Sequence, residues 1–513
     1  MPAQEAVPSL IGQTISHLPR AAEAGRRRDG CGVPVMSRVT LGVAGVLLLG
    51  LTVLRAVECW STDSHLEHVA GVWVAEAIDL TRGVFYRAPY GSYGYGGPRY
   101  FPLFFCVHGA AIKLFGAWRA TGYALSAVSV VLLLVAVYYL TRRIGGARWL
   151  AVAACLAVLA GTSVQDALLT IREDAMAAML NTWGVAICAG EDLGRRRMYY
   201  AAALFTLAFA VKETTVFGTA AVFLYLLLNQ RRRSALHLLA LTAGGYALVL
   251  AGIYLGSEGR AFEVFRLTAA GGIGLRSILV SPSSMVDAMN GYPGETILLA
   301  LGTATLLSTG ARNMRRIPPL LFLCTLVVTV VIFSSDGIAG NHLIDLQVAS
   351  AVLVVDWAFQ VGVPDFAIGA SAAACLIVWL GLMVNYGSTD TVPVRAQLKD
   401  VIHVIGRTDQ TILSEHPLVP IVAGQQPYVI DPFSFRLMLE KRPSLGEPMW
   451  QMLHERRFAA VVLMHDPNSD EGRDFYAGTH FGQGFMERLQ QDYELAGTPG
   501  GQYLYLPRGS ASK

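Results

Sequence analysis

The chain has 513 residues, of which 53% are hydrophobic and only 15% are charged, and its formal net charge is +3. Soluble globular proteins have about 25% charged residues, so this composition excludes an ordinary soluble enzyme and favours a membrane protein. The small net charge and the lack of a basic stripe with interleaved aromatic residues exclude nucleic acid as a partner.

The distribution of arginine predicts the path of the chain through the lipid bilayer. Residues 1–37 are polar and contain Arg26-Arg27-Arg28, and later Arg-rich stretches separate apolar runs. Cytoplasmic loops carry the excess of Lys and Arg. We therefore predict a cytoplasmic N-terminal tail at 1–37, a transmembrane domain at 38–385, and about eleven spans. The expected spans are 39–57, 119–140, 149–163, 174–190, 198–211, 214–229, 235–255, 295–310, 318–334, 343–361 and 366–385.

One apolar segment, residues 101–115, is not counted as a span. It contains Pro102, His108 and Lys113. At 1.5 Å per residue it reaches about 22 Å, which is less than the ~30 Å of a hydrocarbon core. We expect an interfacial or re-entrant helix on the outer face.

Residues 386–513 are predicted to form a small α/β domain outside the cytoplasm. This segment carries the charge and proline that the preceding part lacks. Strands are expected at 411–413, 419–424, 427–430 and 458–464, helices at 393–406 and 446–456, and a closing hairpin at 493–505 around Pro499-Gly500-Gly501. This alternation is typical of a small layered domain.

The loop after the first span holds the densest cluster of ionisable residues, with Asp63, His65, Glu67 and His68. If the segment is helical, Asp63 and Glu67 share one face because they are four residues apart. Such a cluster can serve as a general base, as a divalent-cation site, or as both. The alternative is a solvated turn in which Asp63 caps a helix.

Further ionisable residues stand at the predicted outer ends of later spans. Arg172 precedes one apolar run and Asp174 begins it, and ionisable residues at that depth are candidates for function. The alternative is a helix N-terminus at which acidic residues stabilise the helix dipole. Lys212 lies between two apolar runs and can offer a positive charge to a phosphate, or it can pair with Glu213 and cap a helical hairpin. Arg260 lies in a Gly-rich loop, where it can bind an anionic headgroup or be solvated.

These features, in this order and on one side of the membrane, resemble the GT-C glycosyltransferases. This superfamily includes the protein O-mannosyltransferases and the aminoarabinose transferases that modify lipid A. The resemblance covers about residues 40–385. Its segments are Ala75-Glu76-Ala77, Gly83-Val84-Phe85-Tyr86, Tyr100-Phe101-Pro102-Leu103, Lys113-Leu114-Phe115-Gly116, Arg172-Glu173-Asp174, Phe209-Ala210-Val211-Lys212 and Asn341-His342-Leu343.

The resemblance implies transfer of a sugar from a polyprenyl-phosphate donor to an extracytoplasmic glycan, lipid or protein, in the inner (plasma) membrane. Spacing to Gly83 aligns Glu67 with the family acid, although His68 replaces the second acid of the usual Asp-Glu doublet. The implied catalytic residues are Glu67, Asp63 and Asp174. The implied substrate-binding residues are Lys212, Arg172, Tyr100, Arg99, His342, Asn341 and Arg260. Asp63, Glu67 and His68 are the expected ligands of a divalent cation, Mg²⁺ or Mn²⁺ before Zn²⁺.

Two other functions are compatible with the sequence. A transporter or flippase of lipid-linked or anionic solutes typically has internal repeats and broken helices at mid-membrane. We find no repeat, and the ionisable residues gather on one face, which favours the enzyme. The absent Asp-Glu doublet is the only feature that points to a catalytically inactive relative acting in envelope assembly.

Overall fold

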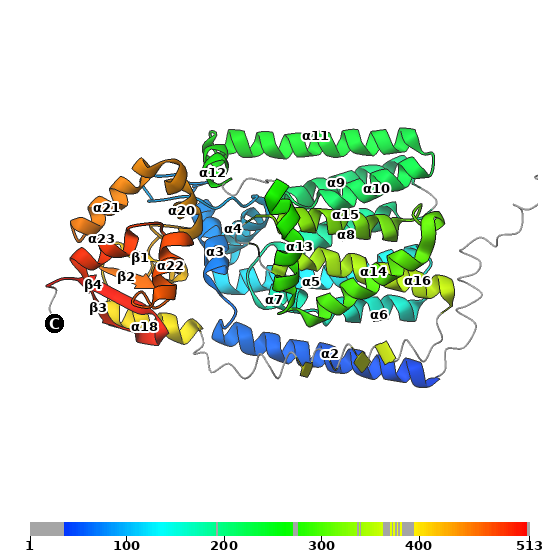
Figure 1. The fold of residues 1–513 in the computed structure, drawn as a ribbon, viewed down its shortest axis with the longest axis horizontal. Helices are drawn as coiled ribbons and strands as arrows, with labels where there is room; N and C mark the ends of the chain where they lie inside the picture. Colours follow the sequence, from blue (N-terminus) through cyan, green and yellow to red (C-terminus); the bar gives the residue numbers. More distant parts are fainter. Residues whose placement is uncertain are drawn as a thin grey trace, which may run out of the picture.

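The computed structural model describes residues 35–190, 193–269, 275–335, 338, 340–362 and 394–509, with scattered positions between 370 and 381. Figure 1 shows a long helical part and, at one end of it, a smaller C-terminal part that contains a β-sheet. Most of the tail predicted at 1–37 and most of the span predicted at 366–385 lie outside the described residues. Both therefore stay predictions.

The apolar runs form helices, many of which lie side by side along the helical part (Figure 1). A helix satisfies its backbone hydrogen bonds within the segment, which is what an apolar environment demands. The helices are α2 (Val35–Thr62), α3 (His68–Thr81), α4 (Leu103–Phe115), α5 (Trp118–Arg143), α6 (Arg148–Leu159), α7 (Thr162–Leu169), α8 (Asp174–Cys188), α9 (Arg195–Val211), α10 (Val216–Leu228), α11 (Arg232–Gly256), α12 (Arg260–Thr268), α13 (Leu275–Met289), α14 (Pro293–Asn313), α15 (Ile317–Ile332), η1 (Gly340–Leu343) and α16 (Ile344–Val361).

Four of the described helical segments are long and apolar enough to cross a membrane: Arg38–Thr62, Trp118–Arg143, Arg232–Gly256 and Gly340–Val361. The pair α6 and α7 qualifies together as a fifth, although it is bent by 67°. The helices α4, α10 and α15 are apolar but shorter. Length and composition thus identify a multi-pass protein with fewer clear spans than the prediction of about eleven. The other crossings, and the interfacial position of α4, stay predictions.

The bend between α6 and α7 interrupts the span predicted at 149–163. Gly161 stands at the break, and a side chain there would collide with Gln347. The Gln347 amide nitrogen donates to the carbonyl oxygens of Ala157 and Val158, at 3.1 and 2.9 Å. The last carbonyls of a buried helix need such partners. A glycine and one amide therefore make the break possible.

The C-terminal part is a four-stranded sheet with helices around it. Its strands are β1 (Ile412–Ser414), β2 (Ala460–Leu463), β3 (Tyr493–Gly497) and β4 (Tyr503–Pro507), in the order β1-β2-β4-β3, with β1 and β2 parallel and the other pairs antiparallel. Leu413 pairs with Val461, which in turn pairs with Tyr505. The helices are α18 (Val394–Ile405), α19 (Leu418–Val422), α20 (Pro432–Lys441), η2 (Pro443–Gly446), α21 (Glu447–His454), α22 (Asp470–Gly478), α23 (Phe485–Asp492) and η3 (Pro499–Gly501).

Two of the strands predicted in this part are wrong. Residues 418–422 form α19, and residues 427–430 contribute only an isolated bridge between Tyr95 and Val429. The bridge exists because a loop rich in glycine and tyrosine, residues 91–97 of the helical part, extends to the C-terminal part. Tyr95 donates its backbone N–H to the Tyr428 carbonyl at 2.7 Å. A partner so far away in the sequence is invisible to local pattern analysis.

Charged contacts fix the C-terminal part against the helical part. Arg87 forms a buried ion pair with Asp79 of α3 at 2.6 Å and also donates to the Pro427 carbonyl at 2.6 Å. Arg442, which directly follows α20, lies 2.9 Å from Glu263 of α12. The segment between α2 and α5, which contains α3 and α4, is called the first loop below. The first loop and α12 both contact the C-terminal part, which is therefore attached through at least these two elements. A cavity between the two parts is therefore bounded by fixed walls.

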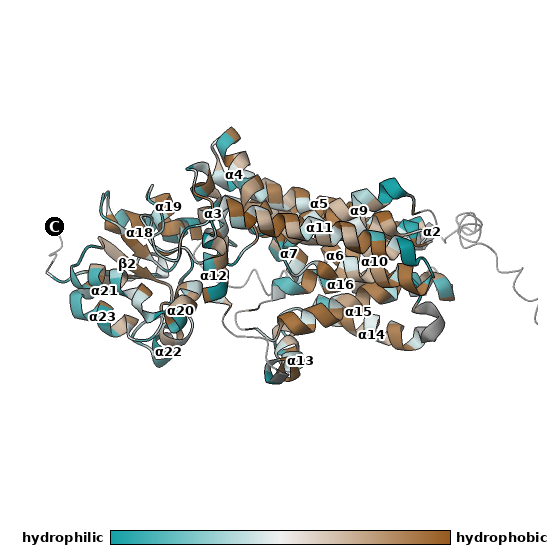
Figure 2. Ribbon diagram, turned by 90° about the horizontal axis from the view of Figure 1, so that it is seen from above, coloured by the Kyte–Doolittle hydropathy of each residue, from teal (hydrophilic) through white to brown (hydrophobic). Residues whose placement is uncertain are grey.

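The Arg-rich end of α5 and the Arg-rich starts of α9 and α11 lie at the end of the helical part away from the sheet (Figure 1). Arg143 donates to the Ala189 carbonyl at 2.8 Å, and Arg316 donates to the Ile144 carbonyl at 3.3 Å. Figure 2 shows hydrophobic residues along the long helices and more hydrophilic ones on the C-terminal helices. This arrangement fits a bilayer around the helical part with the arginines on one side of it.

Candidate functional site

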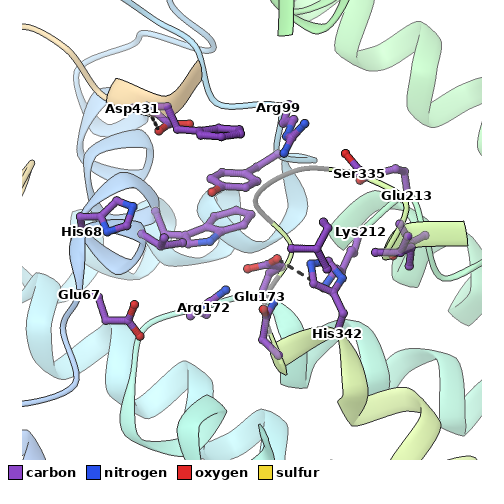
Figure 3. A pocket seen from close by; sticks show the side chains of 18 of the residues that line it. Glu67, His68, Arg99, Arg172, Glu173, Lys212, Glu213, Ser335, His342 and Asp431 are labelled. Carbon is purple, nitrogen blue, oxygen red and sulfur yellow. Dashed lines mark hydrogen bonds and ion pairs between the residues drawn. The ribbon is translucent and has the colours of Figure 1, made fainter. Parts of the chain in front are cut away.

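A cavity of about 1080 Å³ lies where the helical part meets the C-terminal part. Several separate elements line it, and Figure 3 shows part of its wall. The predicted site residues that line it are Glu67, His68, Arg99, Tyr100, Arg172, Lys212, Asn341 and His342. Three others, Asp63, Asp174 and Arg260, do not line it.

Asp174 lies behind the cavity wall and holds three of the predicted residues together. It is the first residue of α8 and is only 3% exposed. Its Oδ1 accepts from Lys212 Nζ at 2.5 Å and from Asn341 Nδ2 at 2.8 Å, and Arg172 Nε lies 3.3 Å from Oδ2. Because its two oxygens face these groups, Asp174 is better placed to position them than to contact a substrate. We call Arg172, Asp174, Lys212 and Asn341 the Asp174 cluster.

The Asp174 cluster shows what Lys212 does at the end of α9. Its second carboxylate neighbour is Glu173, at 3.9 Å, and no ion pair with Glu213 is found among the described residues. The predicted alternative, a Lys212–Glu213 pair capping a hairpin, is therefore not formed. Figure 3 shows Lys212, Glu173 and His342 together on one side of the cavity and Arg172 between them and Glu67. The cluster presents two cationic groups, Arg172 and Lys212, to the cavity.

Aromatic side chains form another section of the wall. Tyr100 stacks on Trp73 with ring centroids 4.3 Å apart, and the Arg99 guanidinium lies 5.5 Å from the centre of the Phe433 ring. The indole N–H of Trp73 is buried and has no hydrogen-bond partner among the described residues. A buried donor of this kind is available to a ligand. Arg99 adds a third cation to the cavity.

The predicted shared helical face of Asp63 and Glu67 is wrong. Helix α2 ends at Thr62, Asp63 adopts a left-handed backbone with φ 56°, and α3 begins only at His68. Glu67 is the N-cap residue of α3 and is exposed at the cavity. The turn between the helices sends the two carboxylates in different directions. Of the pair, only Glu67 reaches the cavity.

The buried Asp63 carboxylate contacts two arginines, one from each part of the protein. Its Oδ2 lies 2.9 Å from both Arg119 of α5 and Arg395 of α18, and Tyr123 donates to its Oδ1 at 3.2 Å. The Asp63 side chain is fully buried. We call this set the Asp63 clamp, because it ties the first loop to the C-terminal part.

The predicted cation site at Asp63, Glu67 and His68 does not fit the structure. The Asp63 oxygens are occupied by the clamp, and Asp63 and Glu67 do not converge. No group of three or more His, Cys, Asp or Glu residues suited to a metal ion is found in the part of the chain that the structure describes. These three residues therefore do not form a common cation site, and we derive no reaction step through one.

Arg260 is also placed differently from the prediction. It begins α12, lies 3.7 Å from Glu258, and its side chain is 39% exposed. Since it does not line the cavity, the structure does not bring it to the other predicted residues. Its exposure agrees better with the predicted alternative, in which Arg260 is a solvated charge.

The C-terminal part supplies residues that sequence reasoning missed. Glu415 Oε1 accepts from His480 Nδ1 at 2.7 Å, while its Oε2 accepts from the Tyr476 hydroxyl at 2.7 Å and from the Met464 backbone N–H at 2.6 Å. Burial alone would raise the pKa of Glu415, but these contacts outweigh it and lower the pKa. Glu415 is therefore a carboxylate held in place by three donors.

His68, the first residue of α3, packs against His480 at the cavity wall. The rings of His68 and His480 are edge to face with centroids 5.2 Å apart. Burial lowers the pKa of His68 to about 4. Near neutral pH its imidazole is thus uncharged. We call Glu415, His480 and His68 the imidazole wall.

A positional signal could have pointed to part of this wall. Glu415 directly follows β1, and Met464 and His465 directly follow β2, which is parallel to β1. Ligands bind at the carboxyl ends of parallel strands. The signal was missed because α19 and residues 427–430 were predicted as strands, which obscured the order of the sheet. His480, at the end of α22, carried no such signal.

Another section of the cavity wall is aliphatic. Val327, Val328, Val331 and Ile332 of α15 line it together with Ile338. The cavity thus has an apolar side formed by a helix of the bundle and a polar side formed by loops and the C-terminal part. Such a cavity suits a ligand with a hydrocarbon chain and an anionic head.

Comparisons with known proteins agree with this picture. Residues 98–255 match the model of the dolichyl-phosphate-mannose-protein mannosyltransferase family. A search among curated proteins gave no significant match.

Solved structures share the fold over most of the chain. ArnT from Cupriavidus metallidurans in the apo state is 14% identical, with a TM-score of 0.60 over 89% of this chain and 97% of that one. The same enzyme bound to undecaprenyl phosphate is 13% identical, with a TM-score of 0.60 over 91% and 99%. The oligosaccharyltransferase AglB from Archaeoglobus fulgidus, in complex with an inhibitory peptide and a dolichol-phosphate, is 12% identical, with a TM-score of 0.56 over 93% and 75%. The resemblance to polytopic GT-C glycosyltransferases predicted from the sequence is confirmed, and the chain has their fold.

Proposed function

We propose that this protein is a membrane glycosyltransferase that moves a sugar from a polyprenyl-phosphate donor to a hydroxyl group of an extracytoplasmic glycan, lipid or protein. The observation that carries this proposal is that one cavity is lined both by the cations Arg172, Lys212 and Arg99 and by the aliphatic residues of α15. A lipid-linked phosphate needs both kinds of surface. The similar structures with undecaprenyl phosphate and dolichol-phosphate support the same class of ligand.

The residues suggest how the reaction proceeds. The acceptor oxygen forms a bond to the anomeric carbon of the sugar while the bond from that carbon to the phosphate oxygen breaks, with inversion. The acceptor proton passes to Glu67, and the polyprenyl phosphate leaves with its electron pair. Arg172 and Lys212 stabilise the negative charge on the departing phosphate. Asp174 holds both cations in place.

The placement in the cell follows from the same proposal. We infer a plasma-membrane protein with residues 1–37 in the cytoplasm and residues 386–513 outside, because a lipid-linked donor and the Arg-rich stretches then lie on opposite sides. A divalent cation, if one takes part, has to use ligands other than Asp63.

The function can be tested in two ways. Mass analysis of envelope glycans, lipids and glycoproteins from a deletion strain should show one component that lacks a sugar, restored by the wild-type gene. The purified protein in detergent should bind undecaprenyl phosphate at least about 10-fold more tightly than undecaprenol, because a charge-assisted phosphate contact is worth about 1.5–3 kcal/mol. Equal binding of both lipids, with an unchanged envelope, would refute the proposal.

A further inference from the structure

The imidazole wall has no role in the donor chemistry described above. Its three residues lie on elements far apart in the sequence: Glu415 after β1, His480 after α22 and His68 at the start of α3. All three line the cavity, and Glu415 and His480 are almost completely buried. A buried charged group is costly unless it is paired and hydrogen-bonded, and three donors satisfy the Glu415 carboxylate. One of these donors is the His480 ring, which Glu415 therefore orients.

The hydrogen bonds fix the direction in which His480 presents its ring. A carboxylate can only accept hydrogen bonds, so the Nδ1 of His480 that lies 2.7 Å from Glu415 carries the proton. In the neutral ring the other nitrogen, Nε2, is then an acceptor. No hydrogen bond to Nε2 is found among the described residues. In this tautomer the ring offers Nε2 as a hydrogen-bond acceptor to a ligand in the cavity.

This chemistry differs from that of the opposite wall. Arg172 and Lys212 attract an anion. The His480 ring, beside the neutral ring of His68, instead suits an uncharged group that donates a hydrogen bond, such as the hydroxyl group of a sugar or protein. We propose that His480 Nε2 accepts a hydrogen bond from a hydroxyl group of the substrate that receives the sugar. His480 is thus a specificity-determining residue, and Glu415 is a positioning residue that acts through it. The inference rests on the proposed glycosyltransferase function.

The substitution Glu415→Gln tests the direction of the ring with little change in shape. Met464 N–H and the Tyr476 hydroxyl both donate to Oε2, so the amide oxygen of the variant has to occupy that position. The amide NH₂ then faces His480 Nδ1, which must accept. The proton moves to Nε2, and the wall offers a donor in place of an acceptor. A role in packing alone would survive this change.

The experiment uses the full-length protein with His480→Ala, Glu415→Gln and the control His454→Ala. His454 belongs to the same part of the protein, but its side chain is 81% exposed and it does not line the cavity. Each variant is expressed in the deletion strain, and the rate at which the missing sugar reappears is measured by mass spectrometry at matched protein levels. Binding of undecaprenyl phosphate to each purified variant reports on the donor half.

We expect the rate to fall about 10- to 100-fold in His480→Ala and in Glu415→Gln, the range of one lost hydrogen bond to a buried group. Binding of undecaprenyl phosphate should stay within about twofold of wild type, and His454→Ala should match wild type in both measurements. An unchanged rate in Glu415→Gln would overturn the inference, and so would a parallel loss of lipid binding. If wild-type protein itself does not bind undecaprenyl phosphate, the proposed function fails first, before any variant is compared.

Discussion

The two polar walls of the cavity differ in how their ionisable groups are arranged. In the Asp174 cluster one buried carboxylate gathers Lys212 and Arg172, so that cationic groups face the cavity. In the imidazole wall one buried carboxylate, Glu415, is surrounded by donors and orients a ring. Both walls use a carboxylate as an anchor. They differ in what the anchor presents, which is positive charge on one side and an uncharged acceptor on the other.

This difference indicates a division of roles between the two parts of the protein. The helical part has the cations and the aliphatic residues of α15, which suit a lipid phosphate. The C-terminal part, with the first loop, has the rings and carboxylates, which suit a hydroxyl-bearing acceptor. Glu67 comes from the loop between the two, where a group that takes the acceptor proton is expected. Variants in each region should therefore change different steps.

The largest effect is expected at the boundary between the walls. In Glu67→Gln the side chain keeps its shape but cannot take a proton, so turnover should fall by about 10²- to 10⁴-fold, the usual contribution of a general base. Binding of undecaprenyl phosphate should be retained. The measurement is transfer from a polyprenyl-phosphate sugar in detergent, with Glu440→Gln as a control outside the cavity. Near-normal turnover would exclude Glu67 as the base.

The next effect concerns the donor wall alone. Lys212→Ala removes one cation from the Asp174 cluster, and a charge-assisted contact to phosphate is worth about 1.5–3 kcal/mol, so affinity for undecaprenyl phosphate should fall about 10- to 150-fold. Lipid binding of the purified variant checks this.

Two further variants make this measurement unambiguous. Lys113→Ala changes an exposed lysine of α4 outside the cavity and should bind lipid as wild type does. Lys212→Met keeps the aliphatic stem, in case the shorter side chain disturbs packing. Unchanged affinity in both Lys212 variants would remove Lys212 from the donor site and weaken the comparison of the walls.

A smaller effect is expected from the Asp63 clamp, because it lies outside both walls. Asp63→Asn keeps a side chain that tolerates the left-handed backbone but removes the charge that Arg119 and Arg395 share. Both arginines are about one third exposed, so solvent screening limits the loss to about 1–3 kcal/mol. A lower melting temperature with lipid affinity unchanged is the expected result. A dead but fully stable variant would restore Asp63 as a catalytic candidate.

No change of activity is expected from the last test, which asks on which side of the membrane the imidazole wall lies. Asp470→Cys introduces a thiol at a position whose side chain is 95% exposed, and Arg196→Cys places one in a predicted cytoplasmic loop. An impermeant reagent should label the first in intact cells and the second only after permeabilisation. The reverse pattern would invert the predicted topology.

The sequence by itself determined those features that depend on local composition. Apolar runs separated by arginine predicted a polytopic helical protein because a bilayer accepts only such segments, and the hairpin around Pro499-Gly500-Gly501 is confirmed between β3 and β4. The order of weak motifs also sufficed to predict a resemblance that the similar folds of solved structures support. The sequence also indicated Arg172, Asp174, Lys212 and Asn341 as candidates, because polar residues at the ends of apolar runs are unusual.

Only the tertiary structure decided how these residues are combined. Lys212 and Asn341 are 38 and 167 positions from Asp174, yet both contact its Oδ1, so a residue expected to be catalytic lies behind the wall. Asp63 and Glu67, four positions apart, separate because a turn replaces the expected helix. Glu415 and His480 meet across 65 positions through the ends of a strand and a helix. Contacts between distant elements depend on packing, and no local pattern encodes them.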